Sequence, residues 1–455
     1  MSFIPPRPAA LQDVRLRWWR FLRFAHSWMD VLTQRSYLML LGHVRLPLLK
    51  LFIINDPVWV ERILVQEPAR FPKHRLMNYA LEPLLGGSPF ATNGDHWRRQ
   101  RRMLDQAMTH ARLGLVFPLM GQACAAMMAQ LDTLPDGGDL DAEALMTAVT
   151  ADIVFRAIFS VPLLGADAQR LYEALSRYQR LSQRALALRL FRLPGFGIER
   201  ARRRQAAIIR NHIGACVDQR FDNVTTEQER SGADIVAGLR AAVDPQDGST
   251  LTRLEVLDQV CLLFLAGHET SASALSWCMY LLGECGDLQD ALREEARGIS
   301  ADGIPADTGG VWRMQRFNAV FKEVLRLYPP VGYFPREATQ DEVIRGVPVP
   351  KGSELLVFPW LLHRHRRWWT EPDAFLPDRF LHRDALPTEA VYLPFGLGER
   401  ACVGAGFAAM EAGLIMANLL SRYRISGEPQ WRPGVVGRLT VRSDKGIRVR
   451  LHRLT

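Results

Sequence analysis

Cys402 has the surroundings with the clearest chemical signal in this chain. It stands in the pattern Phe-x-x-Gly-x-Arg-x-Cys-x-Gly of residues 395–404, and a long run of small and apolar residues follows. A lone cysteine in an intracellular chain is usually a small core residue. This spacing instead predicts a loop that wraps backbone amides around a thiolate. Such a sulfur can bind haem iron and favour cleavage of an O–O bond.

The neighbours of this cysteine suit the same role. Gly398 and Gly404 would let the backbone take unusual dihedral angles and approach a flat cofactor closely. Phe395 would shield the sulfur from water and so influence its redox potential. Arg400 could face a haem propionate. The sequence therefore predicts Cys402 as the metal ligand and these four residues as parts of the cofactor site.

A second group of candidates is the pentapeptide Ala266-Gly267-His268-Glu269-Thr270, inside a long apolar run. A threonine within a helix commonly bonds back to a carbonyl one turn earlier without any function. Gly267, however, costs about 1 kcal/mol relative to alanine in mid-helix. We expect a backbone opening beside Ala266 and Gly267 that leaves room for dioxygen. Thr270 would then supply a hydroxyl, Glu269 would connect to a proton relay, and His268 is not expected to be a ligand.

A predominantly helical scaffold is needed to bring these residues together. Apolar residues recur at three- and four-residue spacing through most of the middle of the chain. This periodicity predicts helices at 95–134, 140–160, 166–190, 200–222, 253–285 and 310–328. A strand is expected at 51–54, and residues 439–442 and 447–451 are expected to pair as a hairpin. Residues 375–395 are rich in proline and irregular.

The chain shows no linker, internal repeat or low-complexity tract. We therefore expect one domain over residues 1–455, in which residues 1–50 form an amphipathic N-terminal extension and the first β region. Residues 14–24 mix arginines with large aromatic residues. That mixture suits either a helix lying on a membrane surface or an ordinary amphipathic helix packed on the domain. A signal peptide and an uncharged apolar run of about 18 residues are both missing, so no transmembrane span is expected.

The amino-acid composition indicates which cellular compartment and which kinds of binding partner to expect. The six cysteines show no C-x-x-C pair, which favours a reducing, cytoplasmic location over a disulfide framework. The net charge of +9 could indicate nucleic acid. Zinc spacings, basic repeats and RNP-like segments are lacking, so we expect no nucleic acid. A docking surface for an acidic protein is the more specific explanation of the excess arginine.

Further motifs give a resemblance to a known family. Glu323 and Arg326 stand at i, i+3 before two prolines, and Arg379 lies in a Pro-x-Arg-Phe segment. In chain order with the Glu269-Thr270 helix and the Cys402 loop, these motifs resemble the cytochromes P-450, the haem-thiolate monooxygenases. The resemblance implies a mainly α, single-domain cytochrome P-450 fold, a helical bundle around haem b with small peripheral β-sheets. It also implies that Glu323, Arg326 and Arg379 form a buried triad.

The same resemblance assigns residues to the haem edge. Trp97 and Arg101, one turn apart, are implied to bind the propionates together with Arg336 and Arg400. Buried carboxylates need such cationic or hydrogen-bonding partners. Ser271 is a departure, because many members carry a second threonine there, but it leaves Thr270 intact.

The implied function is monooxygenation, in which one atom of dioxygen enters an apolar organic substrate and the other leaves as water. No flavin or iron–sulfur module follows the last β segment, so a separate ferredoxin or flavodoxin with its reductase is implied as electron donor. Candidate contacts for that acidic partner are Arg98, Arg99, Arg101, Arg102, Arg364, Arg366, Arg367 and Arg400.

The substrate is less constrained by the sequence. Apolar pocket walls are expected at 76–90, 262–266, 331–334 and 435–436. They favour a lipid-like or terpenoid substrate, and the Gly-His-Glu-Thr helix resembles fatty-acid-oxidising members, so hydroxylation of a fatty acid or other lipid is preferred. The alternatives are a terpenoid or secondary-metabolite hydroxylase, a haem-thiolate isomerase or peroxygenase, and a noncatalytic carrier. Residues 186–196 stand where the family has its access region, and their basic and apolar mixture suits peripheral contact with a membrane.

Overall fold

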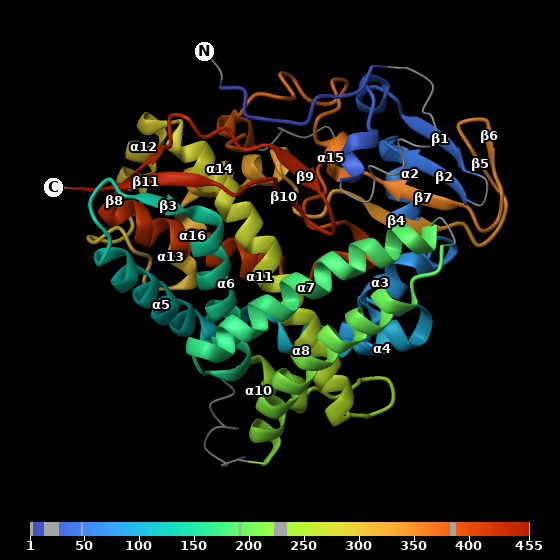
Figure 1. Cartoon of the computed structure of the whole chain (residues 1–455), viewed down its shortest axis with the longest axis horizontal. Coiled ribbons are helices and arrows are strands. Elements are labelled where there is room, and N and C mark those ends of the chain that lie inside the picture. Colours follow the sequence, from blue (N-terminus) through green and yellow to red (C-terminus); the bar gives the residue numbers. More distant parts are fainter. Residues whose placement is uncertain are drawn as a thin grey trace.

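The computed structural model describes residues 3–12, 27–46, 49–190, 193–222, 234–382 and 388–454. Helices dominate, as predicted, and small sheets lie at the periphery (Figure 1). The helices are α2 (Pro57–Glu61), α3 (Arg75–Leu85), α4 (Gly94–Ala107), α5 (His110–Asp132), α6 (Ala142–Phe159), α7 (Gly165–Leu190), α8 (Phe196–Asp222), α10 (Ile235–Ala241), α11 (Arg253–Gly283), α12 (Gly286–Arg297), α13 (Thr308–Arg313), α14 (Gln315–Leu327), α15 (Pro359–Leu362) and α16 (Ala405–Arg422).

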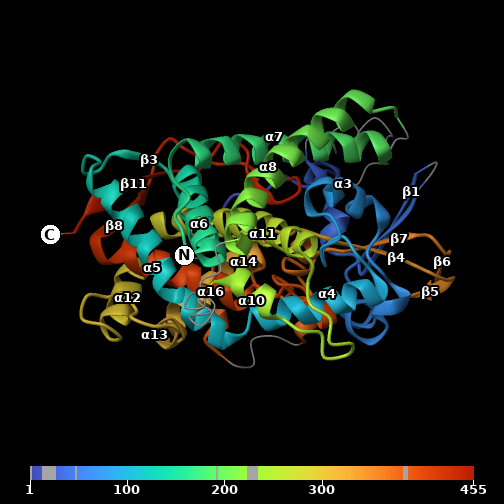
Figure 2. The same ribbon diagram turned by 90° about the horizontal axis from the view of Figure 1, so that it is seen from below.

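The strands form four sheets. They are β1 (Leu41–Leu46), β2 (Leu49–Ile54), β3 (Asp139–Asp141), β4 (Phe334–Glu337), β5 (Glu342–Ile344), β6 (Val347–Val349), β7 (Glu354–Val357), β8 (Tyr423–Gly427), β9 (Val435–Gly437), β10 (Val441–Ser443) and β11 (Arg448–Arg453). The largest sheet has the order β1-β2-β7-β4, and the others are β3-β11-β8, β9-β10 and β5-β6. In Figure 2 the four-stranded sheet and the β3-β11-β8 sheet lie at opposite ends of the molecule.

Helix α11 runs through the middle of the helical layer in both views (Figures 1 and 2). Thr252 and Glu255 begin it with a capping box, in which each side chain bonds the backbone N–H of the other residue. Most of its following residues are buried, since α6, α8, α14 and α16 all pack against it. A helix apolar on nearly every side is expected at the centre of a large core.

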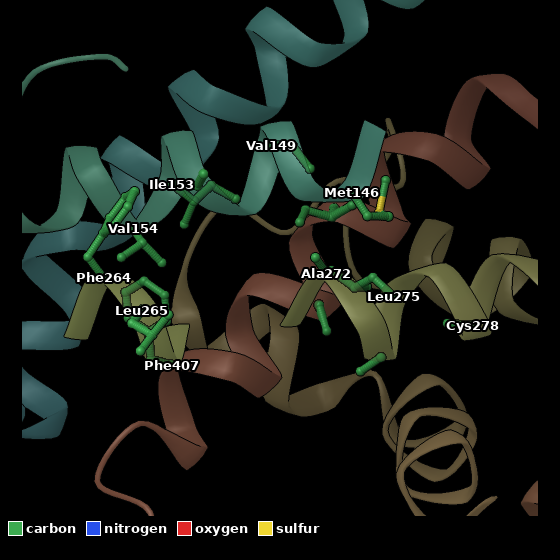
Figure 3. Packing of buried hydrophobic residues seen from close by; sticks show 14 of the residues in the cluster. Met146, Val149, Ile153, Val154, Phe264, Leu265, Ala272, Leu275, Cys278 and Phe407 are labelled. Carbon is green, nitrogen blue, oxygen red and sulfur yellow. The ribbon is translucent and has the colours of Figure 1, made fainter. Parts of the chain in front are cut away.

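The α6–α11 contact is the centre of that core. Figure 3 shows side chains of the two helices interdigitating, with Phe407 of α16 packed beside them. The contributing residues are Met146, Val149, Ile153 and Val154 of α6 and Phe264, Leu265, Ala272 and Leu275 of α11. A second apolar cluster lies under the four-stranded sheet and includes Phe52, Ile54, Leu355 and Val357.

The structure corrects several boundaries. The predicted strand 51–54 is confirmed as part of β2, but the predicted helix 95–134 is two helices, α4 and α5, separated at residues 108–109. The helix predicted at 310–328 likewise divides into α13 and α14. The predicted hairpin of 439–442 with 447–451 is wrong: β10 pairs with β9, whereas β11 pairs with β8 and β3.

Two expectations concern membranes. Among the described helices, α5 is the one long and apolar enough by length and composition to cross a membrane, and 44% of its most apolar window is buried. It packs against α6 and α16. The amphipathic segment predicted at 14–24 lies outside the described residues.

The implied triad is confirmed. Arg326 donates through two nitrogens to the carboxylate of Glu323 over 2.7 and 2.8 Å, and both side chains are fully buried. Arg379 donates to the same carboxylate over 3.2 Å. Arg326 also donates to the carbonyls of His363, Pro372 and Ala374. The triad therefore ties α14 to the irregular segment that follows α15.

Candidate active site

Cys402 lies in the short connection that precedes α16. Its backbone N–H donates to the carbonyl of Phe395 over 2.8 Å, which closes the predicted loop. Cys402 is the one cysteine of the six with an exposed side chain, yet burial raises the pKa of its thiol, and the Arg101 charge opposes that shift. Both observations fit a sulfur whose accessible surface faces the interior of the protein rather than bulk water.

The two predicted glycines differ in what they do. Gly398 has a φ of +74°, and a Cβ there would lie 2.2 Å from the carbonyl oxygen of Leu64. Its close approach is therefore to the backbone of a neighbouring turn. Gly404 has an ordinary φ of −88°, and a Cβ there would lie 3.8 Å from the sulfur of Cys402. Only Gly398 thus needs the unusual dihedral angle that was predicted for both.

One strip in the middle of α11 is accessible although the residues around it are buried. The strip consists of Leu263, Ala266, Gly267 and Thr270, which follow the helical repeat, and Ala266 is the most exposed of them. The Thr270 hydroxyl donates to the Ala266 carbonyl over 2.6 Å. A Cβ on Gly267 would lie 3.0 Å from Val154 of α6, so tight helix packing supplies a reason for this glycine.

Glu269 is buried and fully engaged. Thr440 donates to its Oε1 over 2.8 Å, and Gln179 of α7 donates to its Oε2. Arg442 of β10 lies 3.5 Å from Oε1 and also 3.6 Å from Glu143 of α6. Sequence reasoning missed these partners, because nothing in the local pattern around residues 179 or 440 points to a contact with α11.

Helix α11, which carries Thr270, contacts helix α16, which follows the Cys402 loop. Ser271, which follows Thr270, lies against the buried carboxyl of Glu411. Burial raises the pKa of Glu411 to about 8, and the nearby Ser271 hydroxyl opposes the shift. Figure 3 shows the same two helices in contact farther along α11, where Phe407 approaches Leu265. The helix that carries the accessible strip therefore packs against the helix that follows the Cys402 loop.

The predicted cationic residues gather beside the Cys402 loop. The guanidinium of Arg400 lies 4.0 Å above the Trp97 ring, and it donates to Asn93 over 3.0 Å. Arg101 donates to the carbonyl of Ala401 over 2.7 Å. Burial lowers the pKa of Arg400 to about 10. Helix α4 thus contacts the loop at Arg400 and Ala401, the two residues that precede its cysteine.

Lys73 joins this cluster and was missed by the sequence prediction. It forms an antiparallel bridge with Arg336, and its ammonium donates to the Phe90 carbonyl over 2.9 Å. Burial lowers its pKa well below the ordinary value, and the charges of Arg336, Arg400 and Arg101 lower it further. Burial, with Arg400 nearby, also lowers the pKa of Arg336 to about 10. Lys73 is brought to this cluster by a backbone bridge to a distant residue, so no spacing in the nearby sequence could have predicted its position.

The comparisons with known proteins decide the family. A family model described as Cytochrome P-450 matches residues 43–436. The chain belongs to the cytochrome P-450 family. It is therefore a haem-thiolate oxidoreductase of the monooxygenase class, with the helical fold of that family. The fold, enzyme class and haem cofactor expected from the sequence are confirmed.

Relatives of this cytochrome P-450 come from different kingdoms. It is 31% identical over 349 residues to Cyclooctatin synthase of Streptomyces melanosporofaciens, covering 76% of this chain and 75% of that protein. It is 27% identical over 401 residues to Cytokinin hydroxylase of Arabidopsis thaliana, covering 87% of this chain and 77% of that protein.

The charges of this region fit haem. Lys73, Arg101, Arg336 and Arg400 crowd together, and in the described part of the chain only Arg101 has a carboxylate partner, Asp105 at 2.7 Å. Such unbalanced buried cations are costly alone and suit a group that brings two carboxylates. The Cys402 thiol, which is accessible and lies beside these cations, could supply the thiolate for such a group.

The predicted footprint for an electron donor is partly wrong. Arg364 is buried, and its guanidinium lies 3.8 Å above the ring of Trp360, so it cannot face a partner. Arg102 is committed to the buried Asp244 over 2.6 Å. Arg99 is likewise paired with a glutamate, Glu255. The predicted arginines that remain exposed are Arg98, Arg366 and Arg367.

Proposed function

We propose that this cytochrome P-450 hydroxylates an apolar organic substrate, and that fatty acids or other lipids are the class to test first. The observation that carries the proposal is the accessible strip of α11, in which Leu263 and Ala266 present apolar surface next to the Thr270 hydroxyl. An apolar wall with one convergent polar group is typical of a site for an apolar substrate. The two relatives are named for different products or substrates, so their similarity does not choose among apolar substrates.

In this proposal the Cys402 thiolate would hold the haem iron. Haem held by a thiolate supplies reductive activation of dioxygen. Trp97, Arg101, Arg336 and Arg400, together with Lys73, would bind the propionates. Phe395 would hold the ligand loop by accepting the Cys402 N–H, and Gly398 and Gly404 would keep the loop compact.

Thr270 and Glu269 are proposed to control protons. The Thr270 hydroxyl, held by the Ala266 carbonyl, would keep a proton donor at Oγ1 on the accessible strip. Glu269 would supply protons to it, since its carboxylate lies one residue away and joins Arg442 and Glu143 in a polar chain. Gly267 and Ala266 would leave room beside this hydroxyl for dioxygen.

We propose a separate ferredoxin or flavodoxin, with its reductase, as the electron donor. Support comes from the exposed arginines Arg366 and Arg367 and from the net charge of +9, which suit an acidic protein. Arg98 is also exposed but pairs with Asp95 over 2.6 Å. Rates that do not change with ionic strength would argue against charged docking. A cytoplasmic location with peripheral membrane contact is also proposed. Support for it comes from Leu193 and Phe196, which are 53% and 88% exposed between α7 and α8.

The first experiment is a titration of the purified ferric protein with fatty acids from laurate to stearate and, separately, with geraniol, farnesol and geranylgeraniol. A low-to-high-spin change with a fatty acid supports lipid hydroxylation, and product analysis with a reconstituted electron donor then completes the test. A change with terpene alcohols alone would favour the terpenoid alternative. Product formation with peroxide but without reductant would favour a peroxygenase, and conversion without any oxidant an isomerase.

The ligand assignment has its own test. Cys402→Ser should abolish the thiolate–haem absorption spectrum. A matched control is Cys285→Ser, because Cys285 is partly accessible and lies at the start of α12, away from the Cys402 loop. An unchanged spectrum in Cys402→Ser would refute the assignment. That residues 1–455 form one domain remains a prediction, and a single unfolding transition would support it.

A further inference from the structure

Trp28 fills a slot between two loops that are distant in sequence. A Cβ on Gly332 would lie 2.2 Å from Cζ2 of the Trp28 indole, and a Cβ on Gly437 would lie 2.3 Å from its Cε2. Neither glycine has a positive φ, so any residue could adopt the backbone there. The indole is the steric reason for both glycines, because a rigid ring cannot move aside as a flexible side chain can.

Polar contacts fix the same slot. Ser27, which is fully buried, accepts the backbone N–H of Gly437 on its Oγ over 2.9 Å. The indole N–H of Trp28 donates to the Arg438 carbonyl over 3.0 Å. The ring also packs edge-on against Tyr333 and Phe358, with centroids 5.6 Å apart in both cases. Trp28, itself 2% exposed, is therefore held in one position from every side.

The two loops border the proposed active site. Residues 331–334 lead into β4, which carries Arg336, and the Phe334 ring lies 3.9 Å from where a Cβ of Gly396 would be in the cysteine loop. Residues 435–441 reach α11, because Ser273 donates to the Val441 carbonyl. The Val441 N–H donates to the Pro330 carbonyl over 2.9 Å, so the loops also touch each other.

We propose that Trp28 is a positioning residue for substrate specificity. Acting through Gly332 and Gly437, its indole sets the separation of the 331–334 and 435–436 walls and so determines which apolar substrates fit. The inference rests on the proposed function and on the expectation from the sequence that these two walls line the substrate pocket. It adds a determinant from the N-terminal region, which contributes no side chain to the proposed chemistry.

Substitutions of Trp28 should change substrate selection rather than chemistry. Trp28→Phe keeps an aromatic ring but removes the outer edge of the indole that faces Gly332, so the walls should move closer together. We expect affinity for the largest ligand of a homologous series to fall about tenfold relative to the smallest, the size of effect that one methylene has in an apolar pocket. Trp312→Phe is the matched control, because Trp312 is 40% exposed.

A reciprocal rescue separates positioning from general stability. Gly332→Ala should perturb the pocket as strongly as the Trp28 change, because the new methyl group meets the indole edge. Combining Gly332→Ala with Trp28→Phe should restore the size preference, since a phenyl ring lacks the Cζ2 and Cη2 atoms that clash. Gly437→Ala should not be rescued in this way, because its methyl group meets the inner part of the ring. Gly121→Ala, with open space around it, is the glycine control.

The readout is ligand affinity by haem absorption, with two series. One is the fatty acid and terpene alcohol series, and the other is imidazole and 4-phenylimidazole, which bind iron directly and need no substrate. The proposal would be overturned if the Trp28 and Gly332 variants lost thermal stability while their preference for ligand size stayed unchanged in both series. It would also be overturned if the double variant did not recover the wild-type size preference. The fatty acids and terpene alcohols could give no spectral change while the two imidazoles show the altered size preference in Trp28→Phe and its recovery in the double variant. In that case the substrate proposal fails and the Trp28 proposal stands.

Discussion

The Thr440 hydroxyl donates to Oε1 of Glu269 over 2.8 Å, which joins the C-terminal loop to the central helix. Gln179 and Arg442 complete the surroundings of the carboxylate. Three partners thus hold the position of the acid from which the proposed proton supply to Thr270 starts.

Removing the Thr440 donor should therefore alter proton supply without altering substrate binding. In Thr440→Val we expect a lower ratio of product to NAD(P)H consumed, a changed pH profile of that ratio, and an unchanged spectral dissociation constant. Thr440→Ser retains the hydroxyl and should behave like the wild type. Equal coupling in all three proteins would show that this bond has no part in proton supply.

Thr270→Ala removes the hydroxyl on the accessible strip of α11. Reductant consumption should continue while product formation falls, because the proposed proton donor at Oγ1 is lost. The measurement is product formed per NAD(P)H consumed, with Thr270→Ser as the variant that keeps the hydroxyl. Unchanged coupling in Thr270→Ala would contradict the assigned role. The hydroxyl's bond to the Ala266 carbonyl predicts little change in stability.

Glu323→Ala should be strongly destabilising, because it leaves the fully buried Arg326 without its carboxylate. Breaking a buried pair of this kind costs about 3–5 kcal/mol. The measurement is the free energy of unfolding in urea, together with haem content. Asp218→Ala is the control, since Asp218 pairs with Arg253 at the surface and its loss should change little. A loss in Glu323→Ala no larger than that of the control would mean that the triad is not structural.

Glu411 makes stability depend on pH. Burial raises its pKa from 4.5 in the unfolded chain to about 8, so the folded state retains a proton that the unfolded state gives up. This contribution is fully present below about pH 4.5 and is lost as pH rises to about 8, by ~5 kcal/mol at most. In Glu411→Gln the free energy of unfolding should fall less steeply over that interval. Identical slopes in the two proteins would exclude this origin for the pH dependence.

The sequence predicted the parts of the site that lie within one helix or loop. Cys402 and Thr270 stand in continuous motifs, and the α11 residues follow from helical periodicity. The triad was also predicted, because each of its members belongs to a short motif and the family resemblance joined them. The helical architecture followed from the same periodicity, with errors at residues 108–109 and 314, where short breaks carry no proline or strong polar signal.

The contacts that the sequence could not predict all join distant segments. Lys73 joins the cluster of cationic residues through a bridge to Arg336, and Gln179 contacts Glu269 from another helix. The wrong hairpin has the same cause: β11 prefers β8 and β3, and no local pattern in residues 439–451 records those partners. Arg364 is a further error of the same kind. Its charge suggested a position at the surface, but the side chain is buried and packs on the ring of Trp360.

The slot around Trp28 also has a consequence for biosynthesis. The ribosome makes the indole long before the second glycine that receives it, because the neighbouring Ser27 and its partner Gly437 are 410 positions apart in the chain. Strand β2 likewise cannot form its parallel pairing, in which Leu51 lies opposite Glu354, until β7 has been synthesised. The N-terminal region must therefore stay apart from its final neighbours while most of the chain emerges. Until then the apolar residues of this N-terminal region are exposed, and we expect chaperones to bind nascent chains there. Truncated products should aggregate through the same residues.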